Sequence, residues 1–423
     1  MFDGVKAAFK NIDLRKKILF TLFVIFVFRV GCAIPVPFID ATRLSAAFEA
    51  SGIGSGIGGL LDIMSGGALS QATLFALAIA PYINASIIMQ LLCIAIPALE
   101  RMQKEENGQQ KINQITRYVT VGLGLVMSYG YYSLLAYRFD VLKYKTFFTA
   151  VVVILAFTAG SAIVMWLAER INEKGIGNGI SMTLFASILS QGSGIINWLR
   201  NAFISKNYVG PILVGIISIG MIMGIVLVNK AERRIPIQYA KRVVGRKMYG
   251  GNSTHLPMKV MMTGVMPIIF ASSFCMLPQT IATFFASSSS FAVWVEKYFS
   301  QDTVAYGIVY FLLIVFFNYF YVSVSYNPVE IANNLQKNGG SVPGIRPGEP
   351  TANYLKKTLN KITLFGALFL GVIAILPMIA SAIFNLSFTL GGTSILIVVS
   401  VIMETAVTIE SQIVMRHYRG FLE

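Results

Sequence analysis

The feature that most constrains this chain is the recurrence of long apolar segments along its whole length. Runs of about 18 or more apolar residues follow one another, separated by mostly short polar connections. A helix of that length crosses about 30 Å of hydrocarbon. Of the 423 residues, 55% are hydrophobic and only 13% are charged, which is too little charge to cover a soluble surface of this size. The sequence therefore predicts one integral membrane protein.

Ten membrane-spanning helices are predicted from these runs. Their approximate ranges are 18–36, 73–97, 116–137, 147–168, 178–198, 210–229, 258–284, 304–325, 362–383 and 390–411. Spans one to five fall in residues 1–200 and spans six to ten in residues 201–423, so the two halves begin on opposite sides of the membrane. The expected fold class is an all-α polytopic membrane protein of two inverted five-helix halves, a design typical of a central pathway.

A weaker apolar segment, at about 56–70, lies between the first two spans. It is too short to span, rich in glycine and interrupted by Asp62. Irregular backbone at membrane depth requires surrounding protein or a water-filled cavity, so we expect a re-entrant piece. A surface loop would not explain its large apolar side chains, which are those of Leu60, Leu61, Ile63 and Met64. Gly66 and Gly67 supply a hinge at low steric cost.

Positive charge is concentrated on one side of the predicted membrane. The net charge is +15, and the N-terminus and every second loop carry most of the 34 Lys and Arg residues. By the positive-inside rule, both termini lie in the cytoplasm. Two cytoplasmic loops, 230–259 and 327–361, are long enough to form a docking surface. The first alternates basic and apolar residues as a strand does, which a loop that only sets topology does not need.

The sequence offers little for catalysis. Its three cysteines are isolated and it has only two histidines, so neither a disulfide framework nor a zinc site is supported. The glycine runs lack the GK[ST] of a phosphate-binding loop. Within the spans, Arg29, Glu404 and Glu410 are the clearest ionisable residues, and an ion pair of Arg29 with either acid is favoured over a proton relay. We expect no enzymatic activity and no cofactor.

Five stretches carry a specific resemblance. They are SGGALSQATLFALAIAPYINASIIMQLL at 65–92, EKGIGNGIS at 173–181, STHLPMKVMMTGVMPIIFASS at 253–273, PGIRPGEPTANYL at 343–355 and LGGTSILIVVSVIME at 390–404. In this order they resemble the SecY/Sec61-alpha family, the channel subunits of protein translocases. The similarity runs from the first span to the last.

The resemblance implies an hourglass channel closed by a ring of apolar side chains and a short plug helix. The plug falls at about 57–67, with the residues Leu60, Leu61, Asp62, Ile63, Met64, Gly66 and Gly67. The ring falls at Ile83, Ile87, Ile180, Leu184, Ile269 and Ile397. Leu184 stands where the family usually has isoleucine. A narrow apolar ring offers ions no hydration and gates by dewetting, although an isoleucine in a spanning helix most often only packs.

The resemblance also implies a lateral gate, where spans two and three part from spans seven and eight to release signal sequences and new transmembrane helices into lipid. The candidate polar contacts there are Ser86, Gln90, Ser272 and Ser273. Ordinary interhelical packing explains the same residues equally well.

The docking surface implied by the resemblance has basic residues in both loops. They are Arg233, Arg234, Lys241, Arg242, Arg246, Lys247 and Arg346. The partners implied are the ribosome, the SecA ATPase, SecE, SecG and the signal sequences of preproteins. The expected location is the bacterial cytoplasmic membrane.

Two other functions were weighed against a protein-conducting channel. A secondary transporter of a small solute needs a polar midplane site and coupling acids, where this sequence has isoleucines. A purely structural scaffold needs neither the glycine-rich re-entrant segment nor two elaborate loops. The protein-conducting channel is therefore the favoured prediction.

Overall fold

The computed structural model describes residues 11–50, 62, 64–105, 107–192, 194, 200, 204, 209–239, 242–244, 247–249, 253–282, 290–299, 303–384 and 392–419. Helices dominate this part of the chain. They are α2 (Ile12–Gly31), α3 (Ala41–Ala50), α5 (Ala80–Ala95), α6 (Pro97–Lys104), α7 (Gly108–Ser133), the π-helical turn η1 (Leu134–Arg138), α8 (Phe147–Lys174), α9 (Gly179–Ser190), α11 (Val209–Lys230), α12 (Met266–Ala282), α13 (Ser290–Tyr298), α14 (Val304–Ser325), α15 (Pro328–Lys337), α16 (Glu349–Phe384) and α17 (Gly392–Arg419).

Each of the ten predicted spans contains one of these helices. Six of the described helices are long and apolar enough to cross a membrane, and the bent pair α5 and α6 makes a seventh. The apolar helices within α9 and α12 are shorter, and α2 carries several charges in its first turns. With 12 residues, α9 is only about 18 Å long, short of the hydrocarbon thickness. The count of ten spans stays a prediction.

The second span differs most from its predicted range of 73–97. Residues 66–79 form successive turns, and α5 begins only at Ala80, with Pro81 in its first turn. Ala72 and Ala78 both adopt positive φ, which no helix allows. At its other end α5 meets α6 at a bend of 105°. An apolar run does not by itself distinguish these turns from helix.

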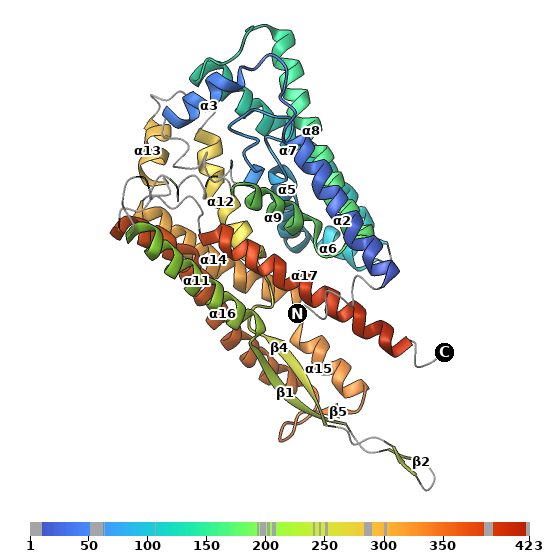
Figure 1. Ribbon diagram of the computed structural model, residues 1–423. Coiled ribbons are helices and arrows are strands. Elements are labelled where there is room, and N and C mark those ends of the chain that lie inside the picture. The colour runs from blue at the N-terminus through green and yellow to red at the C-terminus, as the bar shows by residue number, and fades with distance from the viewer. Residues whose placement is uncertain are drawn as a thin grey trace.

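The helices form two groups with a seam between them (Figure 1). The first group holds α2, α7 and α8, and the second holds α11, α14 and α16. Four helices lie between the groups, and contacts join α5 to α12 and α9 to α17. Each of these pairs takes one helix from residues 1–200 and one from residues 201–423, so the seam runs between the two predicted halves.

A small β structure protrudes from the second group (Figure 1). It contains β1 (Glu232–Tyr239), β4 (Ser253–Lys259) and β5 (Gly340–Ser341), in the order β4-β1-β5 and with antiparallel pairing. A separate hairpin pairs β2 (Arg242–Val244) with β3 (Lys247–Tyr249). Ile235 and Ile237 are buried while their neighbours on β1 are exposed, which confirms the predicted alternation. The fold is thus helical with a small sheet in its two long loops.

Candidate functional site

The six residues of the predicted ring meet in one apolar cluster at the seam. Five are buried to 5% exposure or less, and Ile180 is partly buried against them. They come from α5, α9, α12 and α17, and they are Ile83, Ile87, Ile180, Leu184, Ile269 and Ile397. Ile83 and Ile87 lie one helical turn apart, so one face of α5 presents both. Two helices from each predicted half therefore supply these six residues, although their role as a ring stays a prediction.

The predicted plug is described only in its last residues. Asp62, Met64 and Ser65 are helical, and Gly66 and Gly67 end the helix with φ of 71° and 84°. These left-handed conformations suit glycine, which has no Cβ to clash. Leu60, Leu61 and Ile63 lie outside the described residues. We call residues 62 and 64–70 the plug stem.

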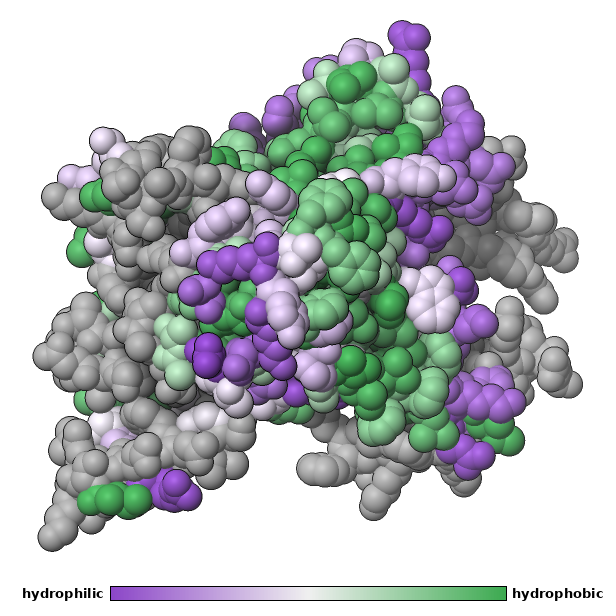
Figure 2. All heavy atoms as spheres, turned by 90° about the horizontal axis from the view of Figure 1, so that it is seen from above, coloured by the Kyte–Doolittle hydropathy of each residue, from purple (hydrophilic) through white to green (hydrophobic). Residues whose placement is uncertain are grey.

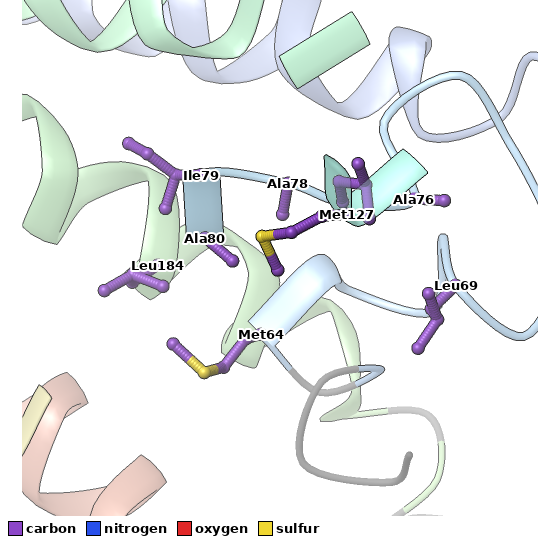
Figure 3. Close-up of a pocket in the computed structure, with 9 residues that line it drawn as sticks. Met64, Leu69, Ala76, Ala78, Ile79, Ala80, Met127 and Leu184 are labelled. Atoms are coloured by element: carbon purple, nitrogen blue, oxygen red, sulfur yellow. The ribbon is translucent and has the colours of Figure 1, made fainter. Parts of the chain in front are cut away.

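The plug stem shares an apolar cluster with the predicted ring residues. Met64 is buried and belongs to the same apolar cluster as Leu184. A cavity of about 30 Å³ is lined by Met64 and Leu69 of the plug stem, Leu184, Met127 of α7 and residues 76–80 (Figure 3). Its lining is almost entirely apolar, so it stays dry although it is large enough for a water molecule. The side chains around such a gap lose dispersion contacts, so the stem is loosely packed on this side.

Hydrogen bonds fix the start and end of the plug stem. The Asp62 carboxylate accepts from the Ser70 backbone N–H at 2.8 Å, which closes the segment into a compact loop. The buried hydroxyl of Tyr131 on α7 donates to the Leu69 carbonyl at 2.5 Å. Polar groups within the membrane require such internal partners.

Arg29 corrects one expectation of the sequence. It was expected to form an ion pair with Glu404 or Glu410, but among the described residues no ion pair joins them. Its Nη1 instead donates to the Gly66 carbonyl oxygen at 3.3 Å. Glu404 lies on α17 within electrostatic range of Lys259 at the end of β4. A charged side chain within the membrane can be stabilised by backbone carbonyl groups. Such a partner cannot be predicted from the positions of the charged residues in the sequence.

The candidate gate residues bond mainly within their own helices. In α5, Gln90 Nε2 donates to Ser86 Oγ at 3.4 Å. In α12, the buried Ser272 donates to a backbone carbonyl of the same helix at 2.8 Å, and Ser273 is buried too. Across the seam, the Gln90 side chain lies near that of Tyr321 on α14. Tyr321 was not among the sequence candidates, since a tyrosine in an apolar span carries no distinguishing pattern.

The structure describes the side chains of only some of the candidate docking residues. Arg233 and Arg234 are exposed on β1, and Arg234 Nε lies 2.6 Å from the Glu232 carboxylate. Arg346 is exposed in the turn before α16, and its backbone carbonyl accepts from Thr351 at 2.8 Å. Lys241 and Arg246 lie outside the described residues, as do the side chains of Arg242 and Lys247.

The two candidate docking loops form one unit. β5 of the second loop pairs with β1 of the first, and α15 packs beside them. A separate apolar core, including Ile235, Val342 and Leu355, lies beneath the sheet. The second loop is shorter than predicted, because α16 begins at Glu349 rather than near residue 362. We call strands β1, β4 and β5, helix α15 and residues 342–348 the loop platform.

The outer surface of the helices is apolar. On α11, for example, Ile212, Ile216 and Ile219 are each more than 60% exposed. Seen from above, broad apolar areas lie beside polar groups (Figure 2). Exposed apolar area of this extent fits contact with lipid. Among the described residues, no group of three or more His, Cys, Asp and Glu side chains could hold a metal ion.

Comparisons with known proteins agree with this geometry. The SecY family model matches residues 73–406. The protein translocase subunit SecY of Streptomyces coelicolor is 44% identical over 447 residues, covering all of both chains. A SecY structure, described as one in which the plug domain stabilises the closed state of the translocation channel and maintains a membrane seal, has a TM-score of 0.67. It is 20% identical, and the alignment covers 95% of this chain and 93% of that one. Sec61 in the canine ribosome-channel complex has a TM-score of 0.63 at 20% identity, with the same coverage.

Proposed function

This chain belongs to the SecY family, and from that premise we propose that it is the protein-conducting channel of a translocase. Unfolded secretory polypeptides cross the membrane through it, between the two five-helix halves. The observation that carries the proposal is the apolar cluster at the seam, to which α5, α9, α12 and α17 each contribute. An apolar constriction forms no specific hydrogen bonds, so it can close around a passing chain of any sequence and still exclude hydrated ions.

The plug stem supports closure of this path. Its Met64 packs into the same cluster as the ring residues. A cavity separates the stem from Leu184, so part of this contact is weak. We propose that the plug rests on the ring in the closed channel and leaves when a polypeptide enters.

We propose that the seam also opens sideways. α5 and α12 are in contact across it, and the Gln90 side chain lies near Tyr321 on α14. Interhelical hydrogen bonds in membranes contribute about 0.6 kcal/mol on average. Polar links of this strength let the seam open for a hydrophobic signal sequence, which then passes into lipid.

The loop platform is the proposed docking surface for the machinery that drives translocation. Arg233 and Arg346 are exposed on it, and basic side chains suit either ribosomal RNA or an acidic protein surface. We propose the ribosome and the SecA ATPase as alternate occupants, with SecE and SecG as companion subunits. This places the platform and both termini in the cytoplasm and the chain in the bacterial cytoplasmic membrane. Energy then comes from these partners, and the chain itself is not an enzyme.

The rival function, transport of a small solute, is not favoured. A transporter binds its solute at a polar midplane site. The four helices that meet at the seam contribute isoleucine, leucine and methionine there instead. An apolar cluster offers a small polar solute no specific partner.

Disulfide trapping of a stalled substrate tests the proposed path. A single cysteine replaces Ile87, which is 2% exposed in the cluster, in an otherwise cysteine-free protein. The matched control places the cysteine at the next residue, Ile88, which is 38% exposed on the other face of α5. An export substrate with one cysteine is stalled midway in membranes that contain the partner subunits.

Crosslinking at Ile87→Cys that requires ATP and a signal sequence, with little at Ile88→Cys, is the expected result. Equal reaction at both positions would mean that the polypeptide does not pass through the cluster. The alternative function, transport of a small solute, would then have to be reconsidered.

A further inference from the structure

The helical turn of the plug stem ends among the membrane helices, where its last carbonyl groups need partners. Gly66 and Gly67 leave the helical conformation there. The carbonyl groups at a helix end have no partner within their own helix and carry partial negative charge. One of them is satisfied locally, because the Asp62 carbonyl accepts from the Gly67 N–H at 2.9 Å. Side chains from two other helices approach the carbonyls of Asp62, Ser65 and Gly66.

The end of α2 supplies the first set of donors. Arg29 Nη1 lies 3.3 Å from the Gly66 carbonyl oxygen, and Cys32 Sγ lies 3.7 Å from the Ser65 carbonyl oxygen. Arg29 therefore brings a positive charge to the negative end of this short helix, which is the favourable arrangement. A cation held by a carbonyl in this way is stabilised within the membrane without a carboxylate.

The end of α9 supplies the second set. Gln191 Nε2 donates to the Asp62 carbonyl at 3.4 Å, and Ser190 Oγ, whose proton goes to the Ser187 carbonyl at 2.6 Å, lies 3.4 Å from the Gly66 carbonyl oxygen. The backbone of Gly66 lies so close that a Cβ there would come within 2.5 Å of Arg29 Nη1 and 2.9 Å of Ser190 Oγ. Two helices therefore meet at one carbonyl of the plug stem.

We propose that Arg29 is the latch that holds the plug stem in the closed channel. This inference rests on the proposed function. The partner is a carbonyl and not a carboxylate, so the stem is held by a charge-assisted hydrogen bond and not by an ion pair. The opposite side of the stem faces the apolar cavity and contributes little hold. The hydrogen bond from Arg29 thus sets the fraction of resting channels in which the plug stem has left its place.

The inference gives a matched pair of glycine variants. Gly66→Ala and Gly67→Ala both place alanine at positive φ, so both carry the same kind of backbone strain. Only at Gly66 does the new Cβ collide with the latch, because the nearest atom at Gly67 is 3.9 Å away. A Cβ at Gly66 would also lie 3.2 Å from the Ser187 Cα, so the comparison separates crowding against Arg29 and α9 from backbone strain alone.

Ion conductance of the resting channel is the first measurement. Translocase complexes carrying each variant are reconstituted in planar bilayers with potassium chloride and without substrate. Arg29→Met and Gly66→Ala are expected to raise the leak about tenfold, the factor that loss of one charge-assisted hydrogen bond gives. Arg29→Lys, which keeps a donor and the charge, should leak less than Arg29→Met. Gly67→Ala should match the wild type.

Labelling of Cys32 with a membrane-impermeant maleimide is the second measurement. Cys32 is only 6% exposed beneath the stem, so labelling reports its departure. Labelling at least several times faster in Arg29→Met is therefore expected only if the stem leaves.

The outcomes separate the latch from the proposed function. If the wild-type complex exports a secretory polypeptide but Arg29→Met and Gly66→Ala show wild-type leak and labelling, Arg29 is no latch. If Gly66→Ala and Gly67→Ala leak equally, backbone strain and not the latch explains the effect. Failure of the wild type to translocate any polypeptide would instead contradict the proposed channel.

Discussion

Gln238 and Ser341 pair across the β1–β5 ladder, with the Ser341 hydroxyl 3.5 Å from the Gln238 carbonyl oxygen. These residues lie 103 positions apart and come from the two loops that the sequence presents as separate. Their pairing makes the loops a single platform with its own apolar core. A docking partner therefore meets one preformed surface and does not have to order two independent loops.

The core of the loop platform is expected to depend on Leu355. This side chain of α16 is fully buried beneath the sheet, and Leu→Ala at such a site costs about 2–5 kcal/mol. We expect Leu355→Ala to expose the platform to limited proteolysis and to reduce partner binding. Leu364→Ala is the control, because Leu364 lies on the same helix with 46% exposure. Equal protease resistance in the two variants would contradict the platform core.

Arg346 is expected to act through its charge and not through the fold. Its side chain is exposed, whereas its backbone is held by Thr351. Arg346→Ala should leave the melting temperature unchanged and weaken ribosome binding, and the slope of affinity against salt should fall by about one charge. Lys143→Ala removes an exposed charge between η1 and α8, the loop predicted for the other side of the membrane, and should change nothing. An unchanged salt slope in Arg346→Ala would remove this residue from the docking surface.

The apolar cluster is expected to seal the resting channel against ions. A polar amide at Ile87 gives water a partner in the constriction and opposes dewetting. Ile87→Asn should therefore raise ion leak in planar bilayers. Ile88→Asn, one residue away but 38% exposed, should not. Leak that is the same for both would show that the seal lies elsewhere.

The features that the sequence predicted are those that follow from the requirements of a lipid bilayer or of a half-buried strand. Helices lie in all ten predicted spans because each apolar run must satisfy its backbone internally. The strand at Glu232–Tyr239 was predicted because alternation at period two is legible wherever one face is buried. The apolar residues of the ring came only from family resemblance, since their side chains look like any other packed isoleucine.

The sequence did not predict features that depend on tertiary contacts. The turns before α5 rest on Ala72 and Ala78 at positive φ, and on the Tyr131 hydroxyl that holds Leu69. No local pattern marks an alanine for that conformation. The partner of Arg29 was missed for a related reason, because backbone carbonyls are present at every residue. The signal that could have pointed to it was the charge itself, standing within an apolar span.

The packing of α8 against these turns gives the last prediction. A Cβ at Gly160 would lie 1.9 Å from the Leu74 carbonyl oxygen, a backbone atom that cannot swing aside. Gly160→Ala must therefore push α8 away from the segment that joins the plug stem to α5, and we expect a loss of several degrees in melting temperature in detergent.

Gly122→Ala on α7 is the matched control for Gly160→Ala. A Cβ there meets nothing within 4 Å, so the helix should gain about 0.5–1 kcal/mol from the better helix former. The two variants have the same composition and opposite expected signs. Because Leu74 belongs to the turns that continue from the plug stem, Gly160→Ala should also raise the resting leak, whereas Gly122→Ala should not. A Gly160→Ala protein as stable and as tight as the wild type would show that α8 does not fix these turns.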